Sequence, residues 1–218
     1  MPELDARAAL GRGCFEAVIT AVHHRWIVLD HTQFQPATPE RQSDTGHVDG
    51  IAVVSVDEGC AGLLHRVGDP MATQGLAMGQ VVKAEVDLQR RHRLMQLHSL
   101  QHLLYLAYQL AHGRSRRLSG TVTDRWASVE VEQQRSSFEV DLDGIRDWIE
   151  QVIADDLVIS SLARPPERGR RFWHVDGVGT IACEARHPAS TGAIGLFGLR
   201  ADHGDAGLVQ LSATLLDV

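Results

Sequence analysis

The sequence predicts an α+β fold in which a small β-barrel, residues 1–86, precedes an α+β domain, residues 87–218. Three observations support this division. Short runs of β-branched residues, separated by glycines, fill the first part of the chain. A long stretch without a helix-breaking residue follows, and shorter strands and a second helix come after it. Because β-rich and mixed segments occupy different parts of 218 residues, we expect two modest domains.

The first part reads as a series of short strands. Residues 18–22 and 26–29 are rich in β-branched residues and are split by the polar residues 23–25, which predicts a hairpin. Further strands are expected at residues 50–56, 62–67 and 80–86. Short strands with frequent glycine are typical of a small barrel.

A long helix is expected between Asp87 and Gly113. Asp87 suits an N-cap, Gly113 suits a C-terminal stop, and neither proline nor glycine lies between them. His98 and His102 are four residues apart in this stretch, so both imidazoles should project from one face of the helix.

The remainder of the chain mixes strands with one more helix. Residues 119–132 and 137–140 read as strands, and residues 144–154 read as a helix. The apolar residues of that helix recur at helical spacing and predict one buried face. They are Ile145, Trp148, Ile149, Val152 and Ile153.

Composition predicts a compact soluble protein. The chain is 44% hydrophobic and 22% charged, which is ordinary globular usage. No apolar stretch approaches the ~20 residues of a membrane span, and residues 1–5 lack the pattern of a signal peptide, so we expect no membrane partner and a cytoplasmic location. Cys14, Cys60 and Cys183 are widely separated, which does not favour a disulfide framework.

Two His/Cys pairs indicate a metal site. With 12 histidines in 218 residues, a His-x-x-x-His pair is expected by chance about 0.6 times, so His98 and His102 alone leave even odds of an ordinary helical pair. Cys183 and His187 repeat the spacing in a turn-rich stretch after a predicted short strand. A thiolate with imidazoles is a donor set that favours zinc, whereas a lone cysteine is usually a buried small hydrophobe.

Four blocks of sequence, in order along nearly the whole chain, carry a resemblance to a known family. They are Leu29-Asp30-His31-Thr32-Gln33-Phe34-Gln35-Pro36, Asp44-Thr45-Gly46, the stretch from Asp87 to Arg91 with His98-Ser99-Leu100-Gln101-His102-Leu103-Leu104, and the stretch from Cys183 to His187 with Thr191-Gly192-Ala193-Ile194-Gly195. On these blocks the chain resembles the freestanding alanyl-tRNA editing proteins, the AlaX family, which share their fold with the editing region of alanyl-tRNA synthetase. The resemblance implies a barrel followed by a zinc-binding editing domain.

The chain departs from the family pattern at two places. Thr38-Pro39-Glu40-Arg41 replaces the family's Gly-Gly-Gly-Gln, so Arg41 occupies the glutamine position unless the loop shifts by one and Gln42 takes it. Between Cys183 and His187, Glu184-Ala185-Arg186 replaces Gly-Gly-Thr. The ligand positions are retained, and new charge is introduced beside the expected substrate pocket.

The resemblance implies a trans-editing hydrolase that deacylates mischarged tRNA(Ala), with Ser-tRNA(Ala) as the first substrate and Gly-tRNA(Ala) as the second. It makes Zn²⁺, held by His98, His102, Cys183 and His187, the cofactor. Four protein ligands would close a tetrahedral zinc site, whereas catalytic sites keep one position open. Thr32 matches the family's pocket threonine, which implies a hydrogen bond to the seryl hydroxyl of the substrate. A threonine at the end of a strand can instead bond its own backbone, and both roles remain open for Thr32. Candidate catalytic groups are Thr32, Glu184 and Asp176, and candidate substrate contacts are Arg41, Gln42, Thr191 and Gly192.

Two other functions are compatible with these residues. One is a zinc-containing tRNA-binding module without turnover, favoured by the altered loop, and the other is a metal-dependent hydrolase of another small acyl ester. The formal net charge of -7 argues against an RNA partner, but RNA binding depends on local clusters of cations. The candidate clusters are Arg90, Arg91 and Arg93; Arg114, Arg116 and Arg117; and Arg164, Arg168, Arg170 and Arg171. The sequence leaves the oligomeric state open between monomer and homodimer.

Overall fold

The computed structural model describes residues 11, 13–133, 139–163, 171–204 and 207–216. The chain divides into two compact units, of which one is residues 10–92 and the other has residues 93–218 as its body. Each unit has its own hydrophobic cluster. None of the helices in the described ranges is long and apolar enough to cross a membrane.

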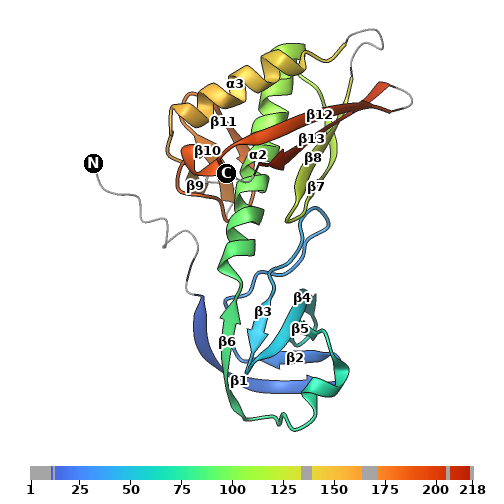
Figure 1. Cartoon of the computed structure of the whole chain (residues 1–218), viewed down its shortest axis with the longest axis vertical. Helices are drawn as coiled ribbons and strands as arrows, with labels where there is room; N and C mark the ends of the chain where they lie inside the picture. The colour runs from blue at the N-terminus through green and yellow to red at the C-terminus, as the bar shows by residue number, and fades with distance from the viewer. Residues whose placement is uncertain (1–10, 12, 134–138, 164–170, 205–206, 217–218) are drawn as a thin grey trace. The chain divides into compact units, whose positions relative to one another are not determined.

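The first unit is a closed antiparallel barrel with the strand order β1-β2-β5-β4-β3-β6 (Figure 1). Its interior is filled by alternate residues of each strand, such as Ala17 and Ile19 of β1 and Val82, Ala84 and Val86 of β6. The strands are β1 (Cys14–His23), β2 (Trp26–Leu29), β3 (Gly46–Val48), β4 (Ile51–Gly59), β5 (Gly62–Val67) and β6 (Val81–Val86), with a short 3-10 turn η1 (Pro70–Thr73) before β6.

The predicted hairpin and the three further strands of the first part are confirmed as β1, β2, β4, β5 and β6. Strand β3 was missed. It has only three residues, and one of them is glycine, so no alternation of apolar and polar residues was visible.

Helix α2 (Leu88–His112) confirms the predicted long helix and both of its ends. The Asp87 carboxylate accepts a hydrogen bond from the Arg90 amide at 2.9 Å, which caps the first turn. Gly113 follows the helix with a φ of 86°, a conformation that glycine adopts without strain. The first turn of α2 belongs to the barrel unit, and the rest of the helix belongs to the second unit.

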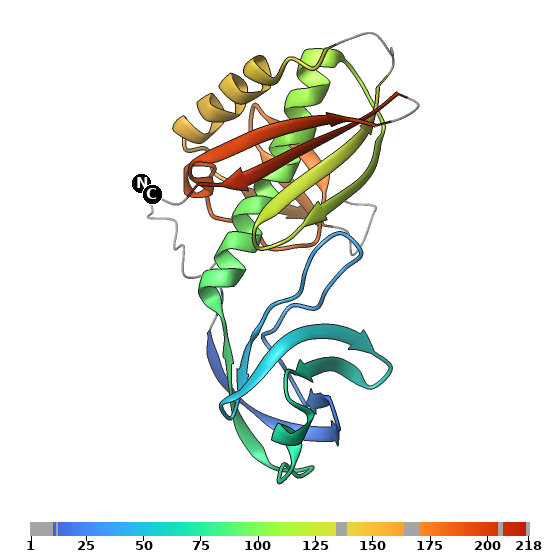
Figure 2. The ribbon, with the colours of Figure 1, turned by 45° about the vertical axis from the view of Figure 1, so that its right-hand side comes forward.

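The second unit contains two antiparallel sheets and two helices. Figures 1 and 2 show α2 running between the sheets, with α3 alongside. One sheet has the order β12-β13-β8-β7 and the other has the order β11-β10-β9. The elements of the second unit that follow α2 are β7 (Arg117–Val122), β8 (Trp126–Glu132), α3 (Leu142–Ala154), β9 (Ser160–Ala163), β10 (Arg171–Val175), β11 (Gly179–Ala182), η2 (Gly192–Ile194), β12 (Phe197–His203) and β13 (Leu208–Leu215).

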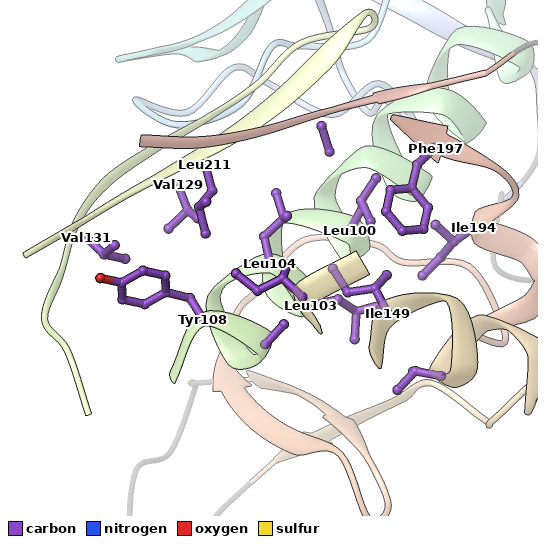
Figure 3. Packing of buried hydrophobic residues seen from close by; sticks show 14 of the residues in the cluster. Leu100, Leu103, Leu104, Tyr108, Val129, Val131, Ile149, Ile194, Phe197 and Leu211 are labelled. Atoms are coloured by element: carbon purple, nitrogen blue, oxygen red, sulfur yellow. The ribbon is translucent and has the colours of Figure 1, made fainter. Parts of the chain in front are cut away.

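The core of the second unit joins α2 to α3 and both sheets. Leu100, Leu104 and Tyr108 of α2 belong to one cluster with Leu211 of β13 and Ile149 of α3 (Figure 3). The predicted buried face of the second helix is confirmed by its buried residues Ile145, Ile149 and Val152. The predicted strand at residues 137–140 is wrong where it can be compared, because residues 139 and 140 lie outside any strand, and residues 137 and 138 are outside the described ranges.

Candidate metal centre

Helix α2 presents two histidines at the interior of the second unit. His98 is 9% exposed and His102 is 3% exposed, and their ring centroids are 4.7 Å apart. This proximity follows from their spacing, since residues four apart lie one above the other on a helix. The fixed backbone of α2 therefore defines the position of both imidazoles.

The β10–β11 hairpin brings Cys183 and His187 to the same place. The Cys183 amide donates to the Arg171 carbonyl at 2.9 Å, which extends the pairing of the hairpin by one residue beyond β11. The Cys183 Sγ lies 3.2 Å from the His187 Nε2 and 3.7 Å from the His98 Nε2. Ligand atoms of His98, Cys183 and His187 all lie within 4.8 Å of one another, and this group could hold a metal ion.

The separations within this group fit a tetrahedral zinc site. Zinc–sulfur bonds of about 2.3 Å and zinc–nitrogen bonds of about 2.05 Å, at a tetrahedral angle, put sulfur and nitrogen about 3.6 Å apart. The two sulfur–nitrogen distances, 3.2 and 3.7 Å, lie on either side of this value. A soft thiolate with imidazole nitrogens is also the donor set that zinc prefers.

A buried serine holds the His187 ring. The Ser99 Oγ lies 2.9 Å from the His187 Nδ1, and the Ser99 side chain has no exposed surface. Because the Nδ1 edge faces this hydroxyl, the Nε2 edge faces Cys183. Such a contact from outside the ligand group fixes ring orientation and tautomer in metal sites.

The structure brings three of the four predicted ligands together and leaves His102 beside them. The His102 ring centroid is 5.1 Å from that of His187 and 5.3 Å from that of Trp173. Burial holds the pKa of His102 well below its usual range, and the nearby His98, His187 and Arg117 lower it further. Its Nε2 has no hydrogen-bond partner within the described ranges. An imidazole that burial keeps neutral, with no hydrogen-bond partner for its Nε2 among the described residues, suits a metal ligand, so His102 fits the group chemically.

The two predicted carboxylate bases occupy different places. Glu184 directly follows Cys183 and is exposed. Asp176 is in the turn of the β10–β11 hairpin, where Val175 pairs with Gly179. Four residues of extended chain separate that turn from Cys183, a distance of about 13 Å. Asp176 is therefore not a neighbour of Cys183.

Thr191 and Gly192, predicted to contact substrate, are bound to the chain itself. The Thr191 side chain is fully buried. Its hydroxyl donates to the Val152 carbonyl at 2.6 Å and accepts from the Leu157 amide at 2.8 Å. The Gly192 amide donates to the Asp156 carboxylate at 3.0 Å. These bonds fasten the end of α3 to η2, and the substrate contacts of Thr191 and Gly192 stay a prediction.

Thr32 lies in the barrel unit, on the loop after β2, and is partly exposed. Its Oγ1 is 2.9 Å from the Nε2 of His65, which is fully buried in β5. The Phe34 amide donates to the same Oγ1 at 3.2 Å. Thr32 thus has both a local backbone bond and a partner from a distant strand.

The predicted substrate residues Arg41 and Gln42 bond within the barrel unit. Thr38 and Arg41 close a tight turn through two backbone hydrogen bonds. The Arg41 guanidinium donates to the Gln35 side chain at 3.0 Å and to the Pro36 carbonyl at 3.2 Å. The Gln42 side chain accepts from Arg90 at 2.7 Å.

The first arginine cluster has structural partners. Arg91 is 1% exposed and forms a salt bridge of 2.6 Å with the fully buried Asp44. Arg90 bonds Gln42, and Arg93 donates to the Asp124 carbonyl at 3.1 Å. Arg114 and Arg116 of the second cluster are exposed. In the third cluster Arg171 is exposed, and Arg164, Arg168 and Arg170 lie outside the described residues.

Sequence reasoning did not single out Ser99 or His65. Ser99 stands between the two helical histidines, and its place next to His98 was the available signal. His65 lies in a predicted strand where its neighbours are apolar or basic, and no spacing linked it to Thr32, which is 33 residues away.

No protein-family model matches the chain. The chain is 27% identical over 204 residues to the alanine–tRNA ligase of Pyrococcus furiosus, which covers 83% of this chain and 22% of the ligase. It is 26% identical over 187 residues to that of Neorickettsia sennetsu, covering 81% of this chain and 19% of the ligase. A shorter match, 31% over 119 residues, to that of Halobacterium salinarum covers 49% of this chain and 12% of the ligase. The chain thus spans at most about a fifth of the length of these curated relatives, and it is similar to a segment of alanine–tRNA ligases.

Proposed function

We propose that the chain is a trans-editing hydrolase that deacylates mischarged tRNA(Ala), with Ser-tRNA(Ala) as its first substrate and Gly-tRNA(Ala) as its second. The observation that carries the proposal is the His98, Cys183 and His187 group, in a chain similar to a segment of alanine–tRNA ligases. A hydrophobic pocket separates amino acids that differ by one methylene only ~10–200-fold, so translation benefits from a second site that hydrolyses wrong products. An ester hydrolase acting on aminoacyl-tRNA meets that need.

Zinc is the proposed cofactor, with His98, Cys183 and His187 as ligands and His102 as a candidate fourth. When bound, zinc supplies Lewis-acid polarisation of an ester carbonyl or a bound water that ionises near neutral pH. A group of three protein ligands is typical of catalytic sites, which keep one position open, whereas four protein ligands are typical of structural sites. The chain's own contribution is to orient the ligand side chains. Ser99 does this for the His187 ring, whose Nδ1 lies 2.9 Å from the Ser99 Oγ.

Two further residues have roles in this proposal. Thr32 is the candidate for recognising the seryl hydroxyl, supported by the match of residues 29–36 to the family pattern. Glu184 is the preferred candidate base, because it is exposed and adjacent to Cys183, whereas Asp176 is in a turn about 13 Å along the hairpin.

The proposed partner is tRNA, and its phosphates would be met by clustered arginines. Arg114 and Arg116, which follow the end of α2, are both exposed. Arginine can grip a phosphate with two parallel hydrogen bonds. These two cations can supply a local positive surface despite the net charge of -7.

A tRNA-binding module without turnover is the second candidate. The observation that favours it is the Arg41 side chain, which bonds Gln35 and Pro36 of its own loop where the family pattern has a glutamine after three glycines. If that loop has lost its substrate contacts, the protein would bind tRNA(Ala) and leave the ester intact.

One assay separates these functions. Purified protein is incubated with Ser-, Gly- and Ala-charged tRNA(Ala), with and without a zinc chelator, and zinc content is measured for the wild type, Cys183→Ala and Cys60→Ala. Cys60 is exposed and serves as the matched control. We expect about one zinc per chain in the wild type and Cys60→Ala, loss of zinc in Cys183→Ala, and hydrolysis of Ser-tRNA(Ala) only by the zinc-loaded proteins. Zinc retention by Cys183→Ala would contradict the metal centre, and tRNA binding without hydrolysis would favour the second candidate.

A further inference from the structure

A histidine is buried in the barrel unit, in contact with a residue of its apolar cluster. His65 of β5 has no exposed surface, and its ring makes an edge contact with Phe34 at a centroid distance of 5.2 Å. A buried imidazole carries two polar nitrogens that must each find a partner, because leaving one unpaired costs free energy. Both nitrogens of His65 have one.

The partners of His65 define which nitrogen carries its proton. The Nδ1 lies 3.0 Å from the Ile27 carbonyl oxygen, and a carbonyl can only accept, so the Nδ1 must be the donor. Burial lowers the pKa of His65, which favours the neutral ring. In a neutral ring with a protonated Nδ1, the Nε2 is a bare acceptor. The Thr32 hydroxyl, 2.9 Å from Nε2, must then donate its proton to His65.

This bond fixes the polarity of the Thr32 hydroxyl. Its one proton is directed at His65, and one of its two lone pairs accepts from the Phe34 amide at 3.2 Å. A single lone pair remains on a side chain that is partly exposed. We propose that His65 is a positioning residue that holds the Thr32 hydroxyl as an acceptor, so that Thr32 selects a hydrogen-bond donor on the aminoacyl group.

This role of His65 rests on the proposed function, and it limits which group of the substrate Thr32 can bind. An aminoacyl ester offers two kinds of donor, namely the α-ammonium of any amino acid and the side-chain hydroxyl of serine. The ester and carbonyl oxygens are acceptors only, so they cannot form a hydrogen bond with the free lone pair of the Thr32 hydroxyl. Without His65 the hydroxyl could rotate and donate instead, and its preference for a donor would be lost.

The test uses variants of the full chain that separate the two bonds of His65. His65→Asn retains an amide near the Nδ1 position, which can still donate to the Ile27 carbonyl, but is too short to reach Thr32. Thr32→Val removes the hydroxyl with little change of shape, and Thr32→Ser retains it. Values of kcat/KM are measured on Ser-tRNA(Ala) and Gly-tRNA(Ala) for the wild type, each single variant and the double variant His65→Asn/Thr32→Val. Thermal unfolding of each protein verifies that it is folded.

We expect His65→Asn to lower kcat/KM on Ser-tRNA(Ala) about 2–10-fold, the range for one oriented hydrogen bond. The double variant should be no worse than Thr32→Val, because both changes remove the same interaction. Thr32→Ser should retain most of the wild-type value. Loss confined to Ser-tRNA(Ala) identifies the seryl hydroxyl as the donor, and equal loss on both substrates identifies the α-ammonium. Additive effects in the double variant, or no effect of His65→Asn on either substrate, would overturn the inference.

A second measurement does not depend on turnover. The ¹⁵N chemical shifts of the His65 imidazole report which nitrogen is protonated, and we expect a protonated Nδ1 and a bare Nε2 at neutral pH. The opposite tautomer, or an imidazolium, would overturn the inference even in an active enzyme. A wild type that shows the expected tautomer but hydrolyses neither aminoacyl-tRNA would instead contradict the proposed function.

Discussion

Ser99 is the residue of the candidate metal centre whose role a single substitution tests most directly. Its hydroxyl contacts the His187 Nδ1 at 2.9 Å and is not itself in the ligand group. Loss of such a supporting contact typically reduces metal affinity about 10–100-fold. We therefore expect Ser99→Ala to bind zinc about 10–100-fold more weakly than the wild type, measured by competition with a chromogenic chelator.

The matched control for this change is Ser99→Thr, which keeps the hydroxyl. Because Ser99 is fully buried, the extra methyl is expected to lower stability, so both variants are compared by thermal unfolding as well. Zinc affinity should remain near the wild-type value in Ser99→Thr. An unchanged affinity in Ser99→Ala would show that Ser99 does not support His187.

Residue type and spacing predicted four candidate ligands, of which His98, Cys183 and His187 lie together, but they did not predict the residues that contact this group. His98 and His102 share a helix face by periodicity alone. The Ser99–His187 contact joins residues 88 apart, and the Thr32–His65 contact joins residues 33 apart. Contacts of that kind depend on how strands and helices pack, and no local pattern encodes them.

At the scale of elements, the loop after β2 is joined to the first turn of α2 by a buried ion pair in the barrel unit. Arg91 donates to Asp44 at 2.6 Å and to the Gln33 carbonyl at 2.7 Å, and Asp44 also accepts from the Gln35 amide. Removing one charge leaves the other buried without compensation. We expect Asp44→Asn to lower the free energy of unfolding of the barrel unit by about 3–5 kcal/mol, measured by chemical denaturation.

An exposed ion pair provides the control for Asp44→Asn. Arg146 and Asp143 of α3 are three residues apart, and their side chains are 38% and 89% exposed. Breaking such a pair typically costs less than about 1 kcal/mol. If Asp44→Asn and Asp143→Asn lower the free energy of unfolding by the same small amount, the buried ion pair does not stabilise the barrel unit more than an exposed pair does.

His65 should also make the stability of the barrel depend on pH. Its pKa in the folded protein is lowered by burial, so the unfolded chain, with an ordinary pKa of about 6.5, binds the proton more readily. The stabilising contribution of the neutral ring is present above about pH 6.5 and is lost as pH falls below it. We expect the free energy of unfolding to decrease from pH 7 to pH 5.

The slope between pH 7 and pH 5 should be shallower in His65→Asn, which has no titrating group at that position. His92 and His102 also have a pKa lowered by burial, and both remain in this variant, so the comparison isolates His65. The same slope in both proteins would assign the pH dependence to other groups.

At the scale of the whole molecule, the sequence predicted most elements because their patterns are local. The barrel strands other than β3, and both helices, lie where β-branched runs and helical periodicity indicated. The clusters of arginines were less informative, since a basic run does not show where its side chains go. Arg91 is 1% exposed and pairs with Asp44, whereas Arg114 and Arg116 are exposed. Only packing distinguishes the buried arginine from the exposed ones.

This distinction leads to a prediction that separates tRNA binding from hydrolysis. Replacing Arg114 and Arg116 together with alanine should weaken tRNA(Ala) binding and reduce the slope of log affinity against log salt by about 1–2, because each lost phosphate contact releases about one counterion less. Arg117 is left in place, since it donates to the buried Gln101. Turnover at saturating tRNA should change little, because the metal ligands are intact.

Cys183→Ala should do the reverse, abolishing hydrolysis while tRNA affinity and its salt slope stay near the wild-type values. The control is Arg146→Ala, which removes one exposed arginine from α3, where it pairs with Asp143. If Arg146→Ala reduces the salt slope by as much per removed charge as the Arg114 and Arg116 double change does, tRNA binding depends on total charge and not on this arginine cluster.

If the zinc-loaded wild type binds tRNA(Ala) without any salt dependence, phosphate contacts do not drive binding. A hydrolase of a small acyl ester would then account better for a metal group in a chain with a net charge of -7.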